Sequence, residues 1–272
     1  MTYPSLTPKN PEDLPRQVLR LLIVPFLVYL AWLIECFLLE QSRDVFSSPT
    51  TFPLLFYTFV GCVLTGTVLP VLLIRRSFAT GDVNMHQIGF RSAGRTILTC
   101  GIAALACYLV VRLAGLPYSA GDDFFILFLL YLPTGIASVM ICWVLLGTHV
   151  QALVRQGGIL ISITTGVTVT AILLGLTLLV HTTAPAQHAP VAGAIILGLV
   201  SALFFFATRD VYAAVIVVTT GLVAVLGGTG AALPAGAEPG IFLSAATAVA
   251  ALLAVHLFFS RNYATVVVVP DT

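Results

Sequence analysis

Charged residues are scarce in this chain. Only 8% of its 272 residues are Asp, Glu, Lys or Arg, whereas about a quarter are charged in an ordinary soluble domain. The 12 basic and 11 acidic residues leave a net charge of +1, and no basic run is long enough to follow a phosphate backbone. This scarcity excludes a soluble globular enzyme, a disordered chain and a nucleic-acid-binding protein.

Cysteine is also sparse and forms no motif. The five cysteines all lie in apolar stretches, without a C-x-x-C pair and without a histidine at zinc-ligand spacing. They are Cys36, Cys62, Cys100, Cys107 and Cys142. We interpret them as small buried apolar residues, not as disulfide partners or redox groups.

Apolar residues are abundant and make up 59% of the chain. They gather in eight runs, each close to the roughly 20 residues that cross the hydrocarbon core of a bilayer as a helix. The runs are Leu21–Leu39, Leu54–Ile74, Thr96–Leu116, Phe124–Val154, Gly158–Val180, Val191–Thr208, Val211–Gly228 and Ile241–Phe259. The sequence therefore predicts an all-α fold, a polytopic membrane helix bundle with about eight transmembrane helices.

The polar segments divide the chain into three parts. Residues 1–20 contain four prolines and are predicted to be an irregular polar arm, followed by an uncleaved first span. Residues 21–259 form the eight-span membrane domain, and residues 260–272 form a short tail. The long fourth run is expected to tilt or to kink at Pro133. Only Arg209 and Asp210 separate the sixth run from the seventh, which predicts a tight turn there.

The basic residues of the loops give an independent test of this division. With eight spans, ten basic residues fall on one side of the membrane and two, Arg43 and Arg112, on the other. The ten are Lys9, Arg16, Arg20, Arg75, Arg76, Arg91, Arg95, Arg155, Arg209 and Arg261. Positively charged loops favour the cytoplasmic side. We therefore expect a plasma membrane protein with both termini in the cytoplasm and the lipid bilayer as its first partner.

Ionisable residues in or near apolar helices are candidate functional residues, because they are costly to place in a bilayer. His149, Asp210 and His256 are predicted to lie at a similar depth, where two imidazoles and a carboxylate would suit a zinc ion. The alternative is that the histidines are hydrogen-bonded packing residues. In either case, we expect the charge of Asp210 to be neutralised by a partner at the cytoplasmic face of the membrane, with His149, His256 and Arg155 as the candidates.

Two other groups of polar residues lie within spans. Glu35 is either a proton or cation site or an interfacial carboxylate, and Glu40 is expected to reach water among the lipid headgroups. The fifth span is rich in hydroxyls, among them Thr170 and Thr177. These hydroxyls either bond to the helices around them or line a polar cavity between the fifth and seventh spans.

Four segments of the chain form a pattern known from one family of membrane proteins. The basic segment Arg75–Arg91 is followed by an apolar helix, and Gly147–Gln156, Ala171–Leu179, and Gly198–Thr208 with Tyr212–Val218 follow in order. This pattern resembles the CPBP family, the eight-helix intramembrane endopeptidases that comprise CAAX proteases and bacteriocin-processing proteins. In that family the corresponding segments are the loop before the third span, a Glu-Glu-x-x-x-Arg-Gly segment, a stretch that holds Phe-x-x-x-His, and a segment that leads to His-x-x-x-Asn.

The catalytic residues of that family are not kept in this register. The paired glutamates fall on Gly147 and Thr148, and the arginine on Ala152. The first histidine falls on Leu178, and the second on Val218. The remaining Phe and Asn fall on Leu174 and Leu222. Peptide hydrolysis needs a general base and a group that stabilises developing charge, and these side chains supply neither.

The sequence therefore leaves three functions open. The first is a CPBP-like scaffold without protease activity, which binds a membrane-embedded peptide or protein. The second is an active endopeptidase with substituted residues drawn from His149, Asp210 and His256. The third is a small transporter or channel, although the two halves share no repeat of broken helices. The sequence identifies no cofactor.

Overall fold

Helices make up nearly all of the described chain. The computed structural model describes residues 13–43, 45–46, 49–80, 83, 85–113, 122–181, 189–226 and 236–263, and none of these forms a strand. The first half contains α1 (Asp13–Val18), η1 (Leu19–Ile23), α2 (Val24–Arg43), α3 (Thr51–Tyr57), η2 (Thr58–Val68), α4 (Leu69–Ala79), α5 (Met85–Ile88) and α6 (Ala93–Leu113). The second half contains α7 (Asp122–Ser138), η3 (Val139–Gly147), α8 (Thr148–Leu153), η4 (Arg155–Gly157), α9 (Ile159–His181), α10 (Ala189–Thr208), α11 (Val211–Leu226) and α12 (Glu238–Tyr263).

Several elements are continuous with one another, so that the described chain contains eight long helices. The elements α1, η1 and α2 form one helix, α3, η2 and α4 a second, and α7, η3 and α8 a third, with π-helical turns in η1, η2 and η3. Each of the eight predicted apolar runs falls on one of these helices as far as its residues are described; residues 114–116 and 227–228 lie outside the described part of the chain. Six are long and apolar enough to cross a membrane, and the sixth and seventh runs form shorter apolar helices. The prediction of an all-α membrane helix bundle is confirmed.

Two local predictions need comment. The irregular arm predicted for residues 1–20 is wrong from Asp13 onward, because Asp13–Val18 is helical and leads directly into the first span. Residues 1–12, and residues 264–272 of the tail, lie outside the described part of the chain. At Pro133, where a kink was one expectation for the fourth run, the chain stays helical, and the helix reaches Leu153 by way of the π-helical turns of η3.

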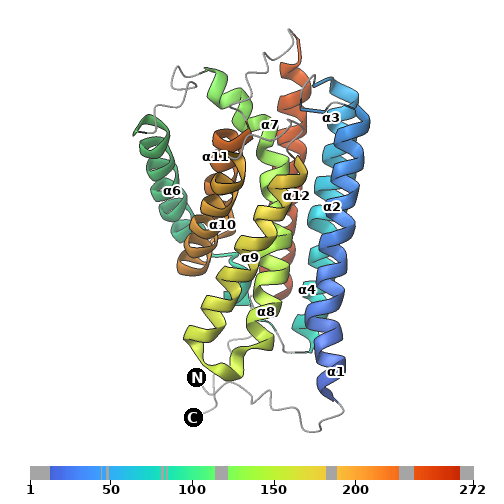
Figure 1. Ribbon diagram of the computed structural model, residues 1–272, viewed down its shortest axis with the longest axis vertical. Coiled ribbons are helices and arrows are strands. Elements are labelled where there is room, and N and C mark those ends of the chain that lie inside the picture. Colours follow the sequence, from blue (N-terminus) through green and yellow to red (C-terminus); the bar gives the residue numbers. More distant parts are fainter. Residues whose placement is uncertain are drawn as a thin grey trace.

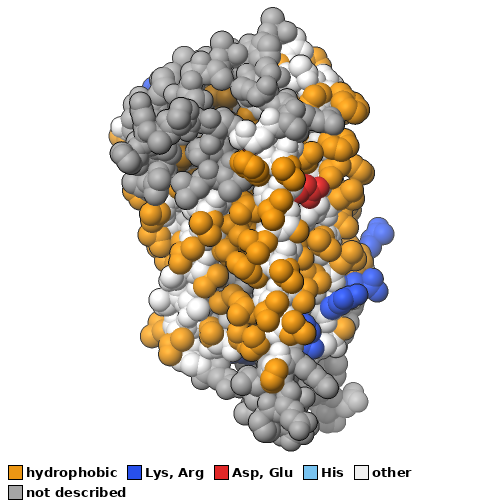
Figure 2. Space-filling view, turned by 45° about the vertical axis from the view of Figure 1, so that its right-hand side comes forward, with side chains coloured by type: hydrophobic (Ala, Val, Ile, Leu, Met, Phe, Trp, Pro, Cys, Tyr) orange, Lys and Arg blue, Asp and Glu red, His pale blue; other side chains and the backbone are white. Residues whose placement is uncertain are grey.

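The helix formed by α7, η3 and α8 is the centre of the bundle. Every residue from Leu130 to Ala152 is buried, and this helix runs between the others in Figure 1. In contrast, α6 lies at the left edge in that view, where it packs on α11 and is otherwise exposed. Hydrophobic side chains cover most of the described face in Figure 2, as expected for a surface in contact with lipid.

Small residues let the helices approach one another closely. A Cβ on Gly198 of α10 would lie 2.6 Å from the carbonyl oxygen of Ala171 in α9. A Cβ on Gly66 would lie 2.5 Å from the Ala137 side chain. Lipid is as apolar as the surfaces of the helices, so the hydrophobic effect does not drive the helices together within the bilayer. Van der Waals contacts between closely packed helices stabilise the bundle instead.

The loops with most of the basic residues meet at one end of the bundle, which we call the basic end. Ser77, close to Arg75 and Arg76, is hydrogen-bonded to His149. Arg209 is bonded to Gln151, and Arg91 is bonded to Arg209. Three loops that the charge pattern assigned to the same side of the membrane therefore lie together.

Candidate functional site

The basic end holds all three residues that the sequence singled out, but each has different partners. His149 in α8 is 1% exposed. Its Nε2 lies 2.7 Å from Oγ of Ser77, and its Nδ1 lies 2.7 Å from the carbonyl oxygen of Leu145. Both ring nitrogens are therefore occupied. His149 is a hydrogen-bonded packing residue that joins α8 to α4.

These two contacts fix the proton of the imidazole. A carbonyl oxygen only accepts hydrogen bonds, so Nδ1 of His149 carries the proton and donates it to Leu145. Nε2 is then an acceptor, to which the hydroxyl of Ser77 donates. A serine hydroxyl on a histidine nitrogen is also the first element of a nucleophile and base pair. Here Ser77 and His149 are each 1% exposed, so the pair is enclosed by protein.

His256 in α12 belongs to a second group of residues. Its Nδ1 lies 2.8 Å from the hydroxyl of Tyr212 in α11. The ring of Phe90 contacts both residues, with centroids 5.3 Å from His256 and 6.4 Å from Tyr212. This aromatic group ties the segment that follows α5 to α11 and α12.

Asp210 is fully buried and caps the N-terminus of α11. Its Oδ1 accepts a 3.0 Å hydrogen bond from the backbone N–H of Ala213, and its Oδ2 accepts a 2.9 Å bond from the hydroxyl of Thr96 in α6. A carboxylate at this position satisfies a free N–H of the first helical turn and interacts favourably with the helix dipole. The expected partners His149, His256 and Arg155 are therefore wrong.

The residue before it, Arg209, makes the tight turn between α10 and α11. Its φ of 52° places it in the left-handed region, which non-glycine residues seldom adopt. Its guanidinium donates from Nη2 to Oε1 of Gln151 at 2.7 Å, and from Nη1 to the carbonyl of Gln87 at 3.1 Å. The guanidinium also lies over the ring of Phe206, 4.8 Å from its centroid. The predicted tight turn is present, and its side chain joins three segments.

The structure does not assemble the metal site that the sequence suggested as one alternative. His149, Asp210 and His256 have separate hydrogen-bond partners. Within the described ranges, no group of three or more His, Cys, Asp or Glu side chains is placed to hold a metal ion.

The acidic residues of the first span differ from expectation. Glu40 is only 3% exposed, so the prediction that it reaches headgroup water is wrong. The face of α2 that carries Glu40 is turned towards the second helix, where Glu40 is close enough to Tyr57 and Cys62 to interact with them electrostatically. Glu35 is half-buried, and its two interpretations remain open.

The hydroxyls of the fifth span are mostly used inside the bundle. Thr170 donates to the carbonyl of Gly166, and Thr177 donates to the carbonyl of Leu173, in each case one helical turn earlier. Tyr29 of α2 donates to the same Leu173 carbonyl at 2.8 Å. These bonds agree with the first interpretation, in which the hydroxyls bond to helices around them.

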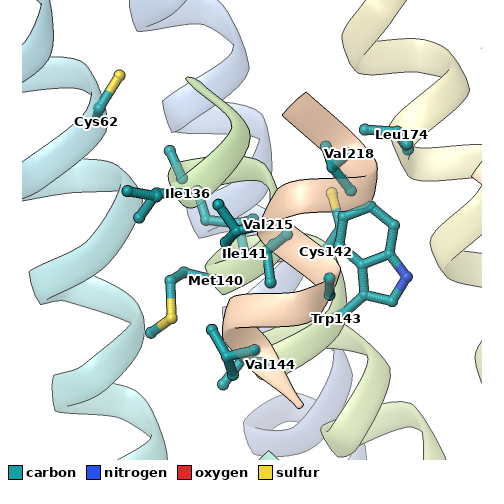
Figure 3. Close-up of a cluster of buried hydrophobic side chains, with 14 of the residues drawn as sticks. Cys62, Ile136, Met140, Ile141, Cys142, Trp143, Val144, Leu174, Val215 and Val218 are labelled. Atoms are coloured by element: carbon teal, nitrogen blue, oxygen red, sulfur yellow. The ribbon is translucent and has the colours of Figure 1, made fainter. Parts of the chain in front are cut away.

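The positions that the expected resemblance would align with the catalytic residues of CPBP proteins lie in tightly packed regions. Leu174, Leu178, Val218 and Leu222 are all 0% exposed. Figure 3 shows Leu174 of α9 and Val218 of α11 beside Cys142 and Trp143 of η3 in one apolar cluster. These positions offer no acid, base or oxyanion donor.

Neighbouring side chains also occupy the space beside Gly147, which the same register would align with the first glutamate of that family's pair. A Cβ on Gly147 would lie 2.9 Å from the ring of Phe206 and 2.9 Å from the methyl group of Thr170. The adjacent Thr148 turns its hydroxyl back to the carbonyl of Val144 at 2.6 Å. A longer side chain at Gly147 would require the side chains of Phe206 and Thr170 to shift.

Sequence reasoning missed Ser77, Thr96 and Gln151, which bind the candidate residues. Ser77 follows two arginines and resembles a loop residue, but α4 extends to Ala79 and turns it inward. The positions of these three residues in the sequence gave no indication of their contacts. Spacing along the chain shows which residues share a face of one helix, but not which helices pack against each other. Comparisons with family models, curated proteins and solved structures found no match to this chain.

Proposed function

We propose that this chain is a non-catalytic relative of the CPBP intramembrane endopeptidases, which acts as a scaffold for a membrane-embedded peptide or protein. The observation that carries the proposal is the apolar packing at Leu178 and Val218, where that family places its histidines. Hydrolysis requires an activated water beside a base. Side chains that are 0% exposed and purely aliphatic leave neither the base nor a place for the water.

The crowding at Gly147 supports the same conclusion. In the proposed register, this residue stands where the family has the first glutamate of its pair. Contacts of 2.9 Å to Phe206 and Thr170 would already meet a methyl group there. In this register, close helix packing stands where the family has a carboxylate, which supports a structural or binding role.

The test is a cleavage assay with the purified full-length chain in detergent or nanodiscs. Prenylated peptides and bacteriocin-type leader peptides are the substrates, and an active CPBP endopeptidase is the positive control. We expect no cleavage above the no-protein background. Cleavage that disappears in the His149→Ala variant would overturn the proposal.

A second candidate function follows from the hydrogen bond between Ser77 and His149. In the tautomer that Leu145 imposes, Nε2 of His149 is placed to take the proton of the serine hydroxyl. Among enzymes, this geometry supports a serine-type hydrolase, which would need the enclosed pair to open to its substrate. A fluorophosphonate probe distinguishes the two candidates. Labelling that is lost in Ser77→Ala but kept in Ser138→Ala would favour the hydrolase, and absence of labelling favours the scaffold.

We also propose that the basic end faces the cytoplasm and that the protein resides in the plasma membrane. The basic residues Arg75, Arg91, Arg155 and Arg209 gather at one end of the bundle, and this supports the orientation because positively charged segments beside membrane spans favour the cytoplasm.

A further inference from the structure

Arg209 is a half-buried cation without an acidic partner among the described residues. Its guanidinium contacts Gln151, the Gln87 carbonyl and the rings of Phe205 and Phe206. Neither oxygen of the adjacent Asp210 is used by Arg209, since they accept from Ala213 and Thr96. The aromatic rings attract the cation but do not cancel its charge.

The polar groups left over around Arg209 are donors. A guanidinium has five N–H donors, and two of them are used in the bonds to Gln151 and Gln87. The amide of Gln151 gives its oxygen to Arg209, and its Nε2 is buried without a hydrogen-bond partner. The residue is only 2% exposed. The Nε2 of Gln151 lies on the side of Gly166 in α9, so the donors that face outward are the remaining N–H groups of Arg209, and an anion would accept from them.

The charge around the site is positive as well. Arg91 donates from Nε to the backbone carbonyl of Arg209 at 3.0 Å. Burial, followed by the charge of Arg91, lowers the pKa of Arg209 to about 10. Burial and the nearby Arg95 likewise lower the pKa of Arg91, and the charge of Asp210 opposes this shift in part. Each cation would be stabilised by an anion placed between them.

The backbone of Arg209 adds a separate observation. Left-handed geometry is unfavourable for a non-glycine residue, whereas glycine or asparagine adopts it more readily. The chain nonetheless has arginine here, at φ 52°. The guanidinium must therefore contribute something that glycine or asparagine would not.

We propose that Arg209, together with Arg91, binds a phosphate group at the basic end of the bundle. The planar fork of arginine matches two phosphate oxygens. The group is supplied either by the headgroup of an anionic phospholipid or by free phosphate. This site is independent of the proposed scaffold function, because it does not involve the positions that match the CPBP catalytic residues.

The first experiment uses the unmodified full-length chain in a neutral detergent. Its unfolding temperature is measured with phosphatidylglycerol, with phosphatidylcholine, and with inorganic phosphate against chloride at equal ionic strength. A ligand that binds only the folded state raises this temperature. Stabilisation by phosphatidylglycerol alone assigns the group to a lipid, and stabilisation by inorganic phosphate assigns it to the free ion as well. If neither stabilises more than its control, the proposal is overturned, and this result needs no variant.

The second experiment locates the site. We expect Arg209→Gln to weaken the apparent affinity by about tenfold or more, because one charge-assisted contact of this kind is worth at least that factor. Arg76→Gln is the matched control, since Arg76 is an exposed arginine of the same end. Arg91→Gln is the second site variant and is expected to weaken binding if Arg209→Gln does not fold. An equal effect of Arg76→Gln, or no effect of either site variant, would show diffuse surface attraction and overturn the proposal.

Discussion

The backbone carbonyl of Gly89 accepts a 3.1 Å hydrogen bond from the N–H of Val211, the first residue of α11. This bond ties the segment after α5 to the turn between α10 and α11, although the two are more than a hundred residues apart in the chain. The N–H of Val211 is one of the donors that a helix N-terminus leaves free. Gly89 thus completes the capping that Asp210 begins.

The position of Gly89 predicts a steric effect that can be separated from a backbone effect. Its φ is +85°, and a Cβ would lie 3.1 Å from the ring of Phe205 and 3.3 Å from the carbonyl group of Arg209. Gly236 has the same φ of +85° but no atom within 4 Å of its Cβ position. We expect Gly236→Ala to cost about 1 kcal/mol from the backbone alone. Gly89→Ala should cost about 1–3 kcal/mol more because of overpacking.

Unfolding of the two glycine variants in the same detergent measures this difference. Gly101→Ala provides a baseline, since Gly101 lies in a helix with open space around it and alanine favours helices. Equal destabilisation by Gly89→Ala and Gly236→Ala would mean that the segment after α5 is not packed against Arg209 as described.

The carboxylate of Asp210 predicts a graded response to substitution. Asp210→Asn keeps a side-chain oxygen that can accept from Ala213, and is expected to cost about 1 kcal/mol or less. Asp210→Ala loses the cap and leaves the hydroxyl of Thr96 without its acceptor. We expect it to cost about 2–3 kcal/mol, the sum of a lost cap and a broken buried hydrogen bond.

A double-mutant cycle with Thr96→Val isolates the contact between α6 and α11. Because Thr96 and Asp210 are bonded directly at 2.9 Å, their coupling energy should be about 0.5–2 kcal/mol. Thr99→Val is the control, since Thr99 bonds to carbonyls of its own helix and should show no coupling to Asp210. If the effects of Thr96→Val and Asp210→Ala on the free energy of unfolding are additive, the two side chains do not interact and the hydrogen bond between them does not form.

The helical architecture could be predicted because the bilayer leaves a chain few choices. A run of about 20 apolar residues must satisfy its backbone polar groups within itself, so each run becomes a helix. The two-residue turn at Arg209 and Asp210 could be predicted for the same reason, because those are the only polar residues between two such runs. Successive transmembrane helices run in opposite directions, so every second connection lies at the same end of the bundle. This places Arg75, Arg155 and Arg209 together.

The partners of the candidate residues could not be predicted in this way. Lipid-facing and core-facing sides of a membrane helix are both apolar, so the sequence of α8 does not reveal that His149 faces Ser77. Glu40 illustrates the same limit, because its place near the end of the first span suggested headgroup water while packing of α2 buries it. Asp210 was expected to need a basic or histidine partner, but a helix N-terminus and one hydroxyl supply its hydrogen bonds.

The orientation of the basic end predicts where reporter domains will be found. Fusions after Ala120 and after Ala186 should place a reporter on the external side, and a fusion after Gly157 should place it in the cytoplasm. The reason is the distribution of ten basic residues on one side and two on the other. Paired alkaline phosphatase and fluorescent protein fusions at each site give opposite readouts, so that a poorly expressed fusion is not mistaken for a topology. Reversal at all three sites would invert the bundle and place the phosphate site proposed at Arg209 on the external face, while reversal at one site alone would contradict the count of eight spans.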